Sequence, residues 1–155
     1  NIIYRNYKKN INISTLISIK NYCKKNKINF FISNNVNLAL KYQLDGVYIP
    51  AFNKQINYIK FFLPLNFKII GSAHNNREIL IKEKQGCNII FLSPIFKVKK
   101  KNSFLNIIKF NFLTLNKKIK FVALGGINNK NLNKLNLLNI CGYAGISYFQ
   151  KKTAP

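Results

Sequence analysis

Short apolar runs alternate with longer amphipathic stretches along the whole chain. The runs are rich in Ile, Phe, Tyr and Val, which is typical of strands buried on both faces. They cover Ile2–Tyr7, Ile28–Ser33, Gly46–Ile49, Phe67–Gly71, Ile89–Ser93, Lys120–Leu124 and Tyr143–Tyr148. Because a strand and the segment after it repeat about every 20–25 residues, the pattern predicts a parallel α/β fold.

The segments between these runs place apolar residues at helical spacing. Ser14 is positioned to cap a helix over Ser14–Asn26, and Asn75 followed by Glu78 resembles a capping box that opens a helix over Asn76–Lys84. Three further helices are indicated by apolar triplets: Ile56, Ile59 and Leu63; Ile107, Ile108 and Leu115; and Leu132, Leu135 and Leu138. Helices therefore connect most of the strands.

The number of strands narrows the fold class. Seven runs are one fewer than a (β/α)8 barrel needs, and 155 residues are fewer than the roughly 200 that such barrels normally have. The sequence opens inside a strand at Asn1 and stops soon after the last run. We therefore expect one domain over residues 1–155, a (β/α)8 TIM barrel without its first strand and last helix. An open doubly wound sheet is the alternative.

The charge of the chain first suggests a nucleic-acid partner. It has 26 Lys and Arg against 3 Asp and Glu, a formal net charge of +23. Only Arg5 and Arg77 are arginines, however, and the lysines are spread along the chain. Asn, Ile, Lys, Phe and Tyr dominate together, which indicates drift of the coding sequence toward A+T. We expect no nucleic-acid partner, although a polyanion-binding protein stays open as an alternative.

The acidic residues and the hydropathy exclude other classes. The only carboxylate side chains are Asp45, Glu78 and Glu83, too few and too scattered to cage a divalent metal or to pair as in a glycosidase. No apolar run approaches the roughly 18 residues of a membrane span, and no signal-peptide pattern opens the chain. A hydrophobic fraction of 48% is too high for a disordered basic tail. We expect a cytoplasmic protein without a membrane partner.

The cysteines point to a reducing compartment. Cys23, Cys87 and Cys141 are odd in number and widely spaced, so they predict no disulfide framework. All of them fall on apolar faces, and we expect them to be buried rather than catalytic.

Polar or glycine residues recur where the predicted strands end, which is where barrels carry their active sites. These residues are Arg5, Ser33, Asn34, Tyr48, Ser72, His74, Ser93, Gly125, Gly126 and Ser147. His74 is the only histidine and follows Ser72 closely, so it is a candidate for proton transfer near neutral pH without a metal. The alternative for His74 is a lone polar residue packed in a loop.

A glycine pair suggests a phosphate site. Gly125 and Gly126 close a strand and precede Asn128, which is placed to cap the next helix, so backbone N–H groups there can approach an anion. Barrels typically complete such a site with the loop after their last strand, here Phe149 and Gln150. A tight turn is the alternative. Lys97 and Lys99–Lys101 follow another strand, where one lysine suits a phosphate or pyrophosphate.

Five segments resemble, in order and spacing, motifs of thiamine-phosphate synthases and TenI-type proteins. They are Phe31–Leu40 with Asp45–Ile49, Ile70–His74 with Glu78, Ser93–Phe96, Leu124–Ile127 and Gly142–Ser147. The resemblance implies a barrel that binds a thiazole phosphate through backbone at Gly126 and around Phe149 and Gln150. Synthases of this family join that thiazole to an aminopyrimidine pyrophosphate, and Mg²⁺ helps the pyrophosphate to leave.

The chain departs from the family pattern around the metal. The two metal-binding aspartates of the family align with Asn34 and Asn53, and the preceding family asparagine aligns with Ser33. Neutral amides are much poorer Mg²⁺ ligands than carboxylates. A Thr-x-Thr that grips pyrophosphate aligns with Val98 and Lys100, whereas Lys101 and Arg5 match the family.

These departures favour the TenI-type branch, whose thiazole tautomerase activity needs no metal and uses a histidine at the position of His74. We therefore expect a metal-independent tautomerase of thiamine biosynthesis, with no cofactor unless it is a competent synthase that uses Mg²⁺. The expected catalytic residues are His74, Ser72 and Lys101. The expected phosphate-binding residues are Arg5, Ser33, Asn34, Gly125, Gly126, Phe149 and Gln150. A synthase or a decayed binding protein is the alternative, and the open strand edges allow a homo-oligomer.

Overall fold

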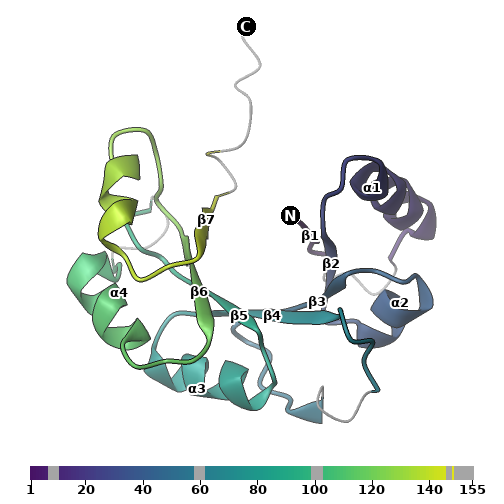
Figure 1. Ribbon diagram of the computed structural model, residues 1–155, viewed down its shortest axis with the longest axis horizontal. Coiled ribbons are helices and arrows are strands. Elements are labelled where there is room, and N and C mark those ends of the chain that lie inside the picture. Colours follow the sequence, from purple (N-terminus) through teal and green to yellow (C-terminus); the bar gives the residue numbers. More distant parts are fainter. Residues whose placement is uncertain (7–10, 58–61, 99–102, 146–147, 149–155) are drawn as a thin grey trace, which may run out of the picture.

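Seven parallel strands form one curled sheet in the computed structural model, which describes residues 1–6, 11–57, 62–98, 103–145 and 148. They pair in chain order: β1 (Ile2–Tyr4), β2 (Phe30–Ser33), β3 (Gly46–Ile49), β4 (Lys68–Ala73), β5 (Ile89–Leu92), β6 (Lys120–Leu124) and β7 (Gly142–Ala144). Figure 1 shows the sheet bent into an arc with the helices on its outer, convex side. The fold is therefore an incomplete (β/α)8 barrel, and not a doubly wound sheet with helices on both faces.

The helices confirm most of the expected elements. They are α1 (Ile13–Lys25), α2 (Val36–Lys41), α3 (Asn76–Lys84), α4 (Asn106–Thr114) and the 3₁₀ helix η2 (Leu132–Leu137). The capping box of α3 is present, because Asn75 Oδ1 accepts the N–H of Glu78 at 2.9 Å. The sequence did not predict α2, because its six residues are too few to show a helical period of apolar positions.

One expectation about a helix cap is wrong, and one expected helix lies partly outside the described residues. The cap of α1 is Asn12 rather than Ser14: Asn12 Oδ1 accepts the N–H of Thr15 at 3.1 Å, and the Ser14 hydroxyl donates to the same oxygen. An asparagine two residues earlier thus satisfies the N-terminal donors first. The helix expected around Ile56 and Leu63 is not seen at those residues, and Ile59 lies outside the described part of the chain.

The edge strands are shorter than the apolar runs. β1 ends at Tyr4 and β7 at Ala144, and each has one neighbour in the described sheet. Tyr7 and residues 146–147 of the two apolar runs lie outside the described residues. Cys23 and Cys87 are buried as expected, but Cys141 is exposed, which corrects the expectation of a buried thiol. It lies directly before β7, which is at the edge of the sheet in the described part of the chain.

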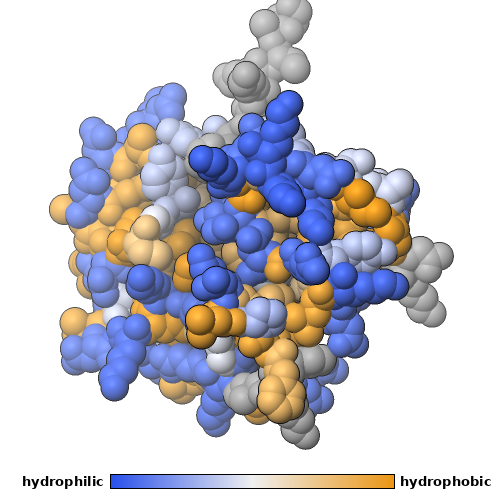
Figure 2. Space-filling model, turned by 45° about the vertical axis from the view of Figure 1, so that its right-hand side comes forward, coloured by the Kyte–Doolittle hydropathy of each residue, from blue (hydrophilic) through white to orange (hydrophobic). Residues whose placement is uncertain are grey.

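Side chains alternate between the two faces of the sheet. The core lies on the convex side, where Ile49, Ile90 and Phe110 are fully buried between strands and helices. Phe31, Tyr48 and Ile70 form a separate cluster on the concave side. No helix of the described residues is long and apolar enough to cross a membrane. On the face shown in Figure 2, apolar areas alternate with hydrophilic ones.

Candidate active site at the carboxyl ends of the strands

The parallel sheet gathers the polar strand ends on one rim. Ser33 ends β2 and pairs in register with Tyr48 of β3, and Ser72 lies near the end of β4. The Ser33 hydroxyl is buried and has no hydrogen-bond partner among the described residues. A buried hydroxyl without a partner is a candidate contact for a ligand or a water molecule.

His74 is held by Ser93, which directly follows β5, and by Glu78 of α3. Its Nδ1 lies 2.7 Å from the carbonyl oxygen of Ser93 and 3.1 Å from the Ser93 hydroxyl. Its backbone N–H donates to the carboxylate of Glu78 at 2.7 Å. A carbonyl oxygen only accepts hydrogen bonds, so Nδ1 is the ring atom that donates here, and Nε2 is not engaged by this contact. The expected role of His74 in proton transfer stays a prediction.

Ser72 contacts Tyr48 and the loop after β3. Its hydroxyl oxygen accepts the Tyr48 O–H at 2.9 Å and the N–H of Ala51 at 3.0 Å. Both Ser72 and Tyr48 are buried. These contacts tie the start of the loop to the concave face, and the expected catalytic role of Ser72 stays a prediction.

Asn34 and Asn53 pair with each other across the rim. The Asn53 amide donates to Asn34 Oδ1 at 2.8 Å, and Asn53 Oδ1 accepts the N–H of Gln55 at 2.9 Å. Asn34 has a φ of 61°, a left-handed conformation that asparagine tolerates well. Both amide oxygens are thus engaged in hydrogen bonds within the protein.

Below this pair lies a buried lysine that the sequence analysis missed. Lys82 of α3 is 0% exposed, and its ammonium group donates to the carbonyl oxygens of Pro50 and Asn53 and to Gln85 Oε1. Burial lowers the pKa of Lys82 to about 8, and burial raises the pKa of the nearby Cys87 thiol to about 12. The signal in the sequence was a lysine three residues after Ile79, on the apolar face of α3.

The glycine pair packs backbone against backbone. A Cβ on Gly126 would lie 2.6 and 2.7 Å from the carbonyl oxygens of Phe96 and Lys97, and one on Gly125 would lie 2.9 Å from Pro94 Cβ. Both glycines have positive φ. The expected helix N-terminus after them is not α-helical, since the next element is the 3₁₀ helix η2 from Leu132. The predicted phosphate site therefore consists here of the loop backbone alone. The Asn131 side-chain amide holds this loop by donating to the Gly126 carbonyl oxygen at 2.8 Å.

A cavity of about 620 Å³ lies on the concave face, lined mainly by apolar side chains. Phe31, Tyr48, Ile70 and Phe91 line its floor, and the exposed Arg5 is one of its polar groups. An apolar hollow with few polar groups suits a small aromatic ligand that carries a charged substituent. Lys101, Phe149 and Gln150 lie outside the described residues, and so does Ser147.

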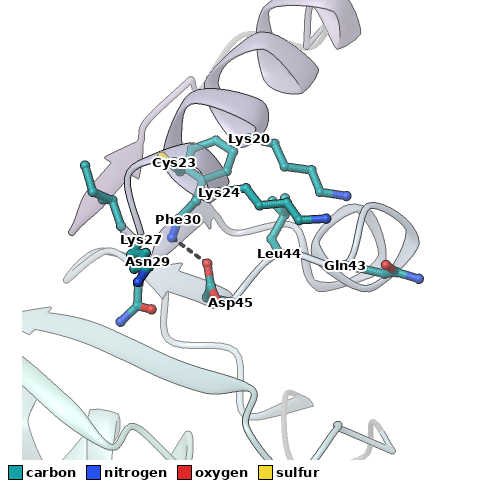
Figure 3. Close-up of a pocket in the computed structure, with 10 residues that line it drawn as sticks. Lys20, Cys23, Lys24, Lys27, Asn29, Phe30, Gln43, Leu44 and Asp45 are labelled. Atoms are coloured by element: carbon teal, nitrogen blue, oxygen red, sulfur yellow. Dashed lines mark hydrogen bonds between the residues drawn. The ribbon is translucent and has the colours of Figure 1, made fainter.

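A second hollow lies at the opposite edge of the sheet, where β2 and β3 begin. Figure 3 shows Lys20, Lys24 and Lys27 around it and the Asp45 carboxylate accepting the N–H of Phe30, at 2.7 Å. Because it is at the amino ends of the strands, it does not belong to the rim that carries His74.

Comparison with known proteins shows to which family the chain belongs. The profile of the family described as thiamine monophosphate synthase matches residues 2–149. This chain belongs to that family. A thiamine-phosphate synthase of Prochlorococcus marinus is 34% identical over 121 residues, which cover 76% of the chain and 35% of that protein.

Other relatives agree with this assignment to the thiamine monophosphate synthase family. A thiamine-phosphate synthase of Pelagibacter ubique is 33% identical over 153 residues, 88% of this chain and 70% of that protein. A solved structure of thiamine phosphate pyrophosphorylase from Pyrococcus furiosus shares the fold, with a TM-score of 0.70 and 23% identity over 90% of this chain and 69% of that one. The chain thus spans between a third and about two thirds of the length of these proteins.

The magnesium site that the family pattern implies does not fit the residues present. Its two positions hold the neutral amides of Asn34 and Asn53, and the oxygen of each already accepts a hydrogen bond. Among the described residues no group of three or more His, Cys, Asp or Glu side chains could hold a metal ion. Mg²⁺ prefers carboxylate oxygens, which this part of the rim does not offer.

Proposed function

We propose that this chain is the barrel of a thiamine-phosphate synthase, which couples a thiazole phosphate to an aminopyrimidine pyrophosphate. The proposal is carried by one observation: residues that match the family motifs follow separate strands, and the sheet brings His74 after β4 and Gly126 after β6 to a single rim. The names of the relatives support the coupling activity over the tautomerase activity expected from the sequence alone.

The coupling reaction makes two demands on the rim. The thiazole nitrogen forms a bond to the methylene carbon of the pyrimidine, and the carbon–oxygen bond to the pyrophosphate breaks with its electron pair on the leaving oxygen. The site must hold two anionic groups and tolerate the negative charge that develops on the pyrophosphate. The Gly125–Gly126 backbone is suited to the thiazole phosphate, and Arg5 and the lysines after β5 supply positive charge for the pyrophosphate.

A second candidate, thiazole tautomerisation, is favoured by His74. This reaction shifts one proton within a thiazole carboxylate phosphate, so it needs a group that takes the proton from one atom of the substrate and returns it to another. The His74 ring contacts the Ser93 carbonyl oxygen through Nδ1, and this leaves Nε2 as the ring atom for that task. Neither a metal nor a second substrate is required.

A paired assay on the full chain separates the two activities. One arm supplies the thiazole carboxylate phosphate alone and follows tautomerisation. The other supplies the thiazole phosphate without the carboxylate together with the aminopyrimidine pyrophosphate, with and without Mg²⁺, and follows thiamine phosphate. Product in the second arm supports the synthase, and turnover confined to the first arm replaces it with the tautomerase. No turnover in either arm overturns both and leaves a decayed binding protein.

The substitution His74→Asn sharpens the assay. It removes the proton acceptor and keeps a polar side chain of similar reach, so tautomerisation should fall about 100-fold or more. Coupling should fall much less, because its bond-forming step transfers no proton to His74. Lys84→Met, at an exposed position of α3, is the control that should leave both rates unchanged.

A further inference from the structure

The loop after β3 is held by two buried side chains, Lys82 of α3 and Gln85, which follows the last residue of that helix. The Lys82 ammonium donates to Pro50 O at 2.9 Å, to Asn53 O at 2.8 Å and to Gln85 Oε1 at 2.8 Å. These three hydrogen bonds use all three protons of the group. None of these three partners is a carboxylate, so the groups in direct contact with the charge are oxygen dipoles, and the Glu78 carboxylate acts on it without a hydrogen bond.

Gln85 completes the same set of contacts. Its amide donates to Asn53 O at 3.0 Å and to Gln55 O at 2.7 Å, and its side chain is 0% exposed. The two side chains together bind the carbonyl oxygens of Pro50, Asn53 and Gln55. We call them the Lys82–Gln85 clamp and the residues they hold the 50–55 loop.

The sheet makes room for this clamp at one position. A Cβ on Gly71 would lie 2.7 Å from Lys82 Cδ, so a larger residue in β4 would collide with the lysine stem. The stem thus passes over Gly71 toward the end of β3. A buried cation that reaches a loop in this way is costly unless its donors are all satisfied, and here they are.

The upper side of the 50–55 loop is part of the rim. Ala51 donates its N–H to Ser72, and the Asn53 amide donates to Asn34. The loop is therefore held between the clamp below and the rim residues above, and Asn53 joins both sets of contacts. If the clamp is lost and Asn53 moves, the hydrogen bond from Asn53 to Asn34 should change with it.

We propose that the Lys82 ammonium is an internal cation that sets the 50–55 loop in place of a divalent metal, with Lys82 and Gln85 acting as positioning residues for Asn53 and Asn34. A metal ion orders loops by drawing oxygen ligands around a positive charge, and the ammonium does the same for the carbonyls of Pro50 and Asn53. The shape of this part of the rim is then independent of Mg²⁺. The inference rests on the proposed function only in taking the rim as the substrate site.

Hydrogen exchange and melting with Mg²⁺ alone test the proposal on the full chain. In the unaltered chain, Mg²⁺ should change neither the melting temperature nor the protection of amides in the 50–55 loop, because no carboxylate site gains from the ion. In Lys82→Met, the same amides should exchange at least about tenfold faster, while those of β5 keep their protection. The matched control is Lys84→Met, which alters an exposed lysine of the same helix.

A pH series separates positioning from plain packing. In the unaltered chain the protection factors of the loop should fall as pH rises through about 8, where the ammonium loses one donor proton, and they should be flat in Lys82→Met. The charges that act on Lys82 are those of Cys87 and Glu78, and both are kept in the variant. A loss of packing alone would lower protection without this pH dependence.

Two results would overturn the proposal: a rise in melting temperature or loop protection with Mg²⁺ in the unaltered chain, or unchanged loop protection in a folded Lys82→Met. If Lys82→Met does not fold, Gln85→Leu tests the same loop through the other half of the clamp, with the same two outcomes. None of these measurements uses a thiamine precursor. The clamp can therefore fail while the synthase assay succeeds, and the reverse.

Discussion

Two loops of the rim are held in opposite ways. The 50–55 loop is fixed by side chains that arrive from other elements, with Lys82 and Gln85 below it and Asn34 beside it. The loop with Gly125 and Gly126 is fixed by the absence of side chains, which lets its backbone touch the segment after β5. The first arrangement depends on protonation and tolerates some change, whereas the second tolerates hardly any added atom.

The largest expected effect comes from breaking the backbone contact. Gly126→Ala places a Cβ within 2.7 Å of two carbonyl oxygens, at a φ of 74° that side chains rarely adopt. The left-handed conformation costs about 1–2 kcal/mol and the clash about 1–3 kcal/mol, so the free energy of unfolding should fall by roughly 3 kcal/mol. Urea unfolding measures the loss, and inorganic phosphate binding should weaken with it.

Gly142→Ala is the matched control for that loss. A Cβ there meets nothing within 4 Å, so stability should change by less than about 0.5 kcal/mol. If the two alanine variants were equally stable, the packing of the glycine loop against the β5 segment would not be what holds it.

The next effect is a pH dependence carried by the clamp. The pKa of Lys82 falls from 10.5 to about 8 in the folded chain, so between these values the unfolded chain binds the extra proton. Stability from this group is therefore lowest below pH 8 and rises with pH above it, by at most about 1.4 kcal/mol per pH unit. Cys87 opposes this above pH 9, because its pKa rises from 9.0 to about 12 and the folded chain then keeps a proton that the unfolded chain loses.

The clean window is thus pH 8 to 9, between the onset of the Lys82 effect and that of Cys87. As pH rises from 8 to 9, the unfolding free energy of the unaltered chain should increase relative to that of Lys82→Met. The other lysines are present in both chains, so their contributions cancel in the difference. Stability then rises while the 50–55 loop loosens, because deprotonation relieves a buried charge but removes one hydrogen bond. A difference that is flat over this window, with Lys84→Met also flat, contradicts a lowered pKa at Lys82.

The same contrast explains what the sequence could predict. The strand pattern and the capping residues of α3 act locally or through the period of apolar positions, and they predicted the fold and the rim that carries His74. The Asn34–Asn53 pair and the clamp join residues that are 19 and about 30 positions apart, and such contacts leave no local period. Lys82 was visible only as a lysine on an apolar face, in a chain where lysine is everywhere.

A smaller effect tests whether the upper contacts of the 50–55 loop add to the clamp. Asn53→Ala removes the hydrogen bonds to Asn34 and Gln55 and leaves the backbone carbonyl that binds the clamp. The unfolding free energy should fall by about 1 kcal/mol, in the range of one or two partly exposed hydrogen bonds. Lys54→Ala, exposed in the same loop, should be neutral in the same urea titration. A loss above about 3 kcal/mol would mean that the side chain, and not the clamp, carries the loop.

The smallest effect compares Lys82 with a lysine whose charge is paired at the surface. Lys117 lies 3.3 Å from the Glu83 carboxylate, the only ion pair seen among the described residues, and its side chain is 22% exposed. Lys117→Ala should therefore lower the unfolding free energy by about 0.5 kcal/mol or less, and added salt should remove the difference because such pairs are screened. Lys118→Ala, next to it and exposed, is the control without a carboxylate partner in the described chain. A loss well above about 1 kcal/mol that persists in high salt would show that a surface pair can anchor this fold as a buried ammonium does. The distinction between the two kinds of lysine would then not hold.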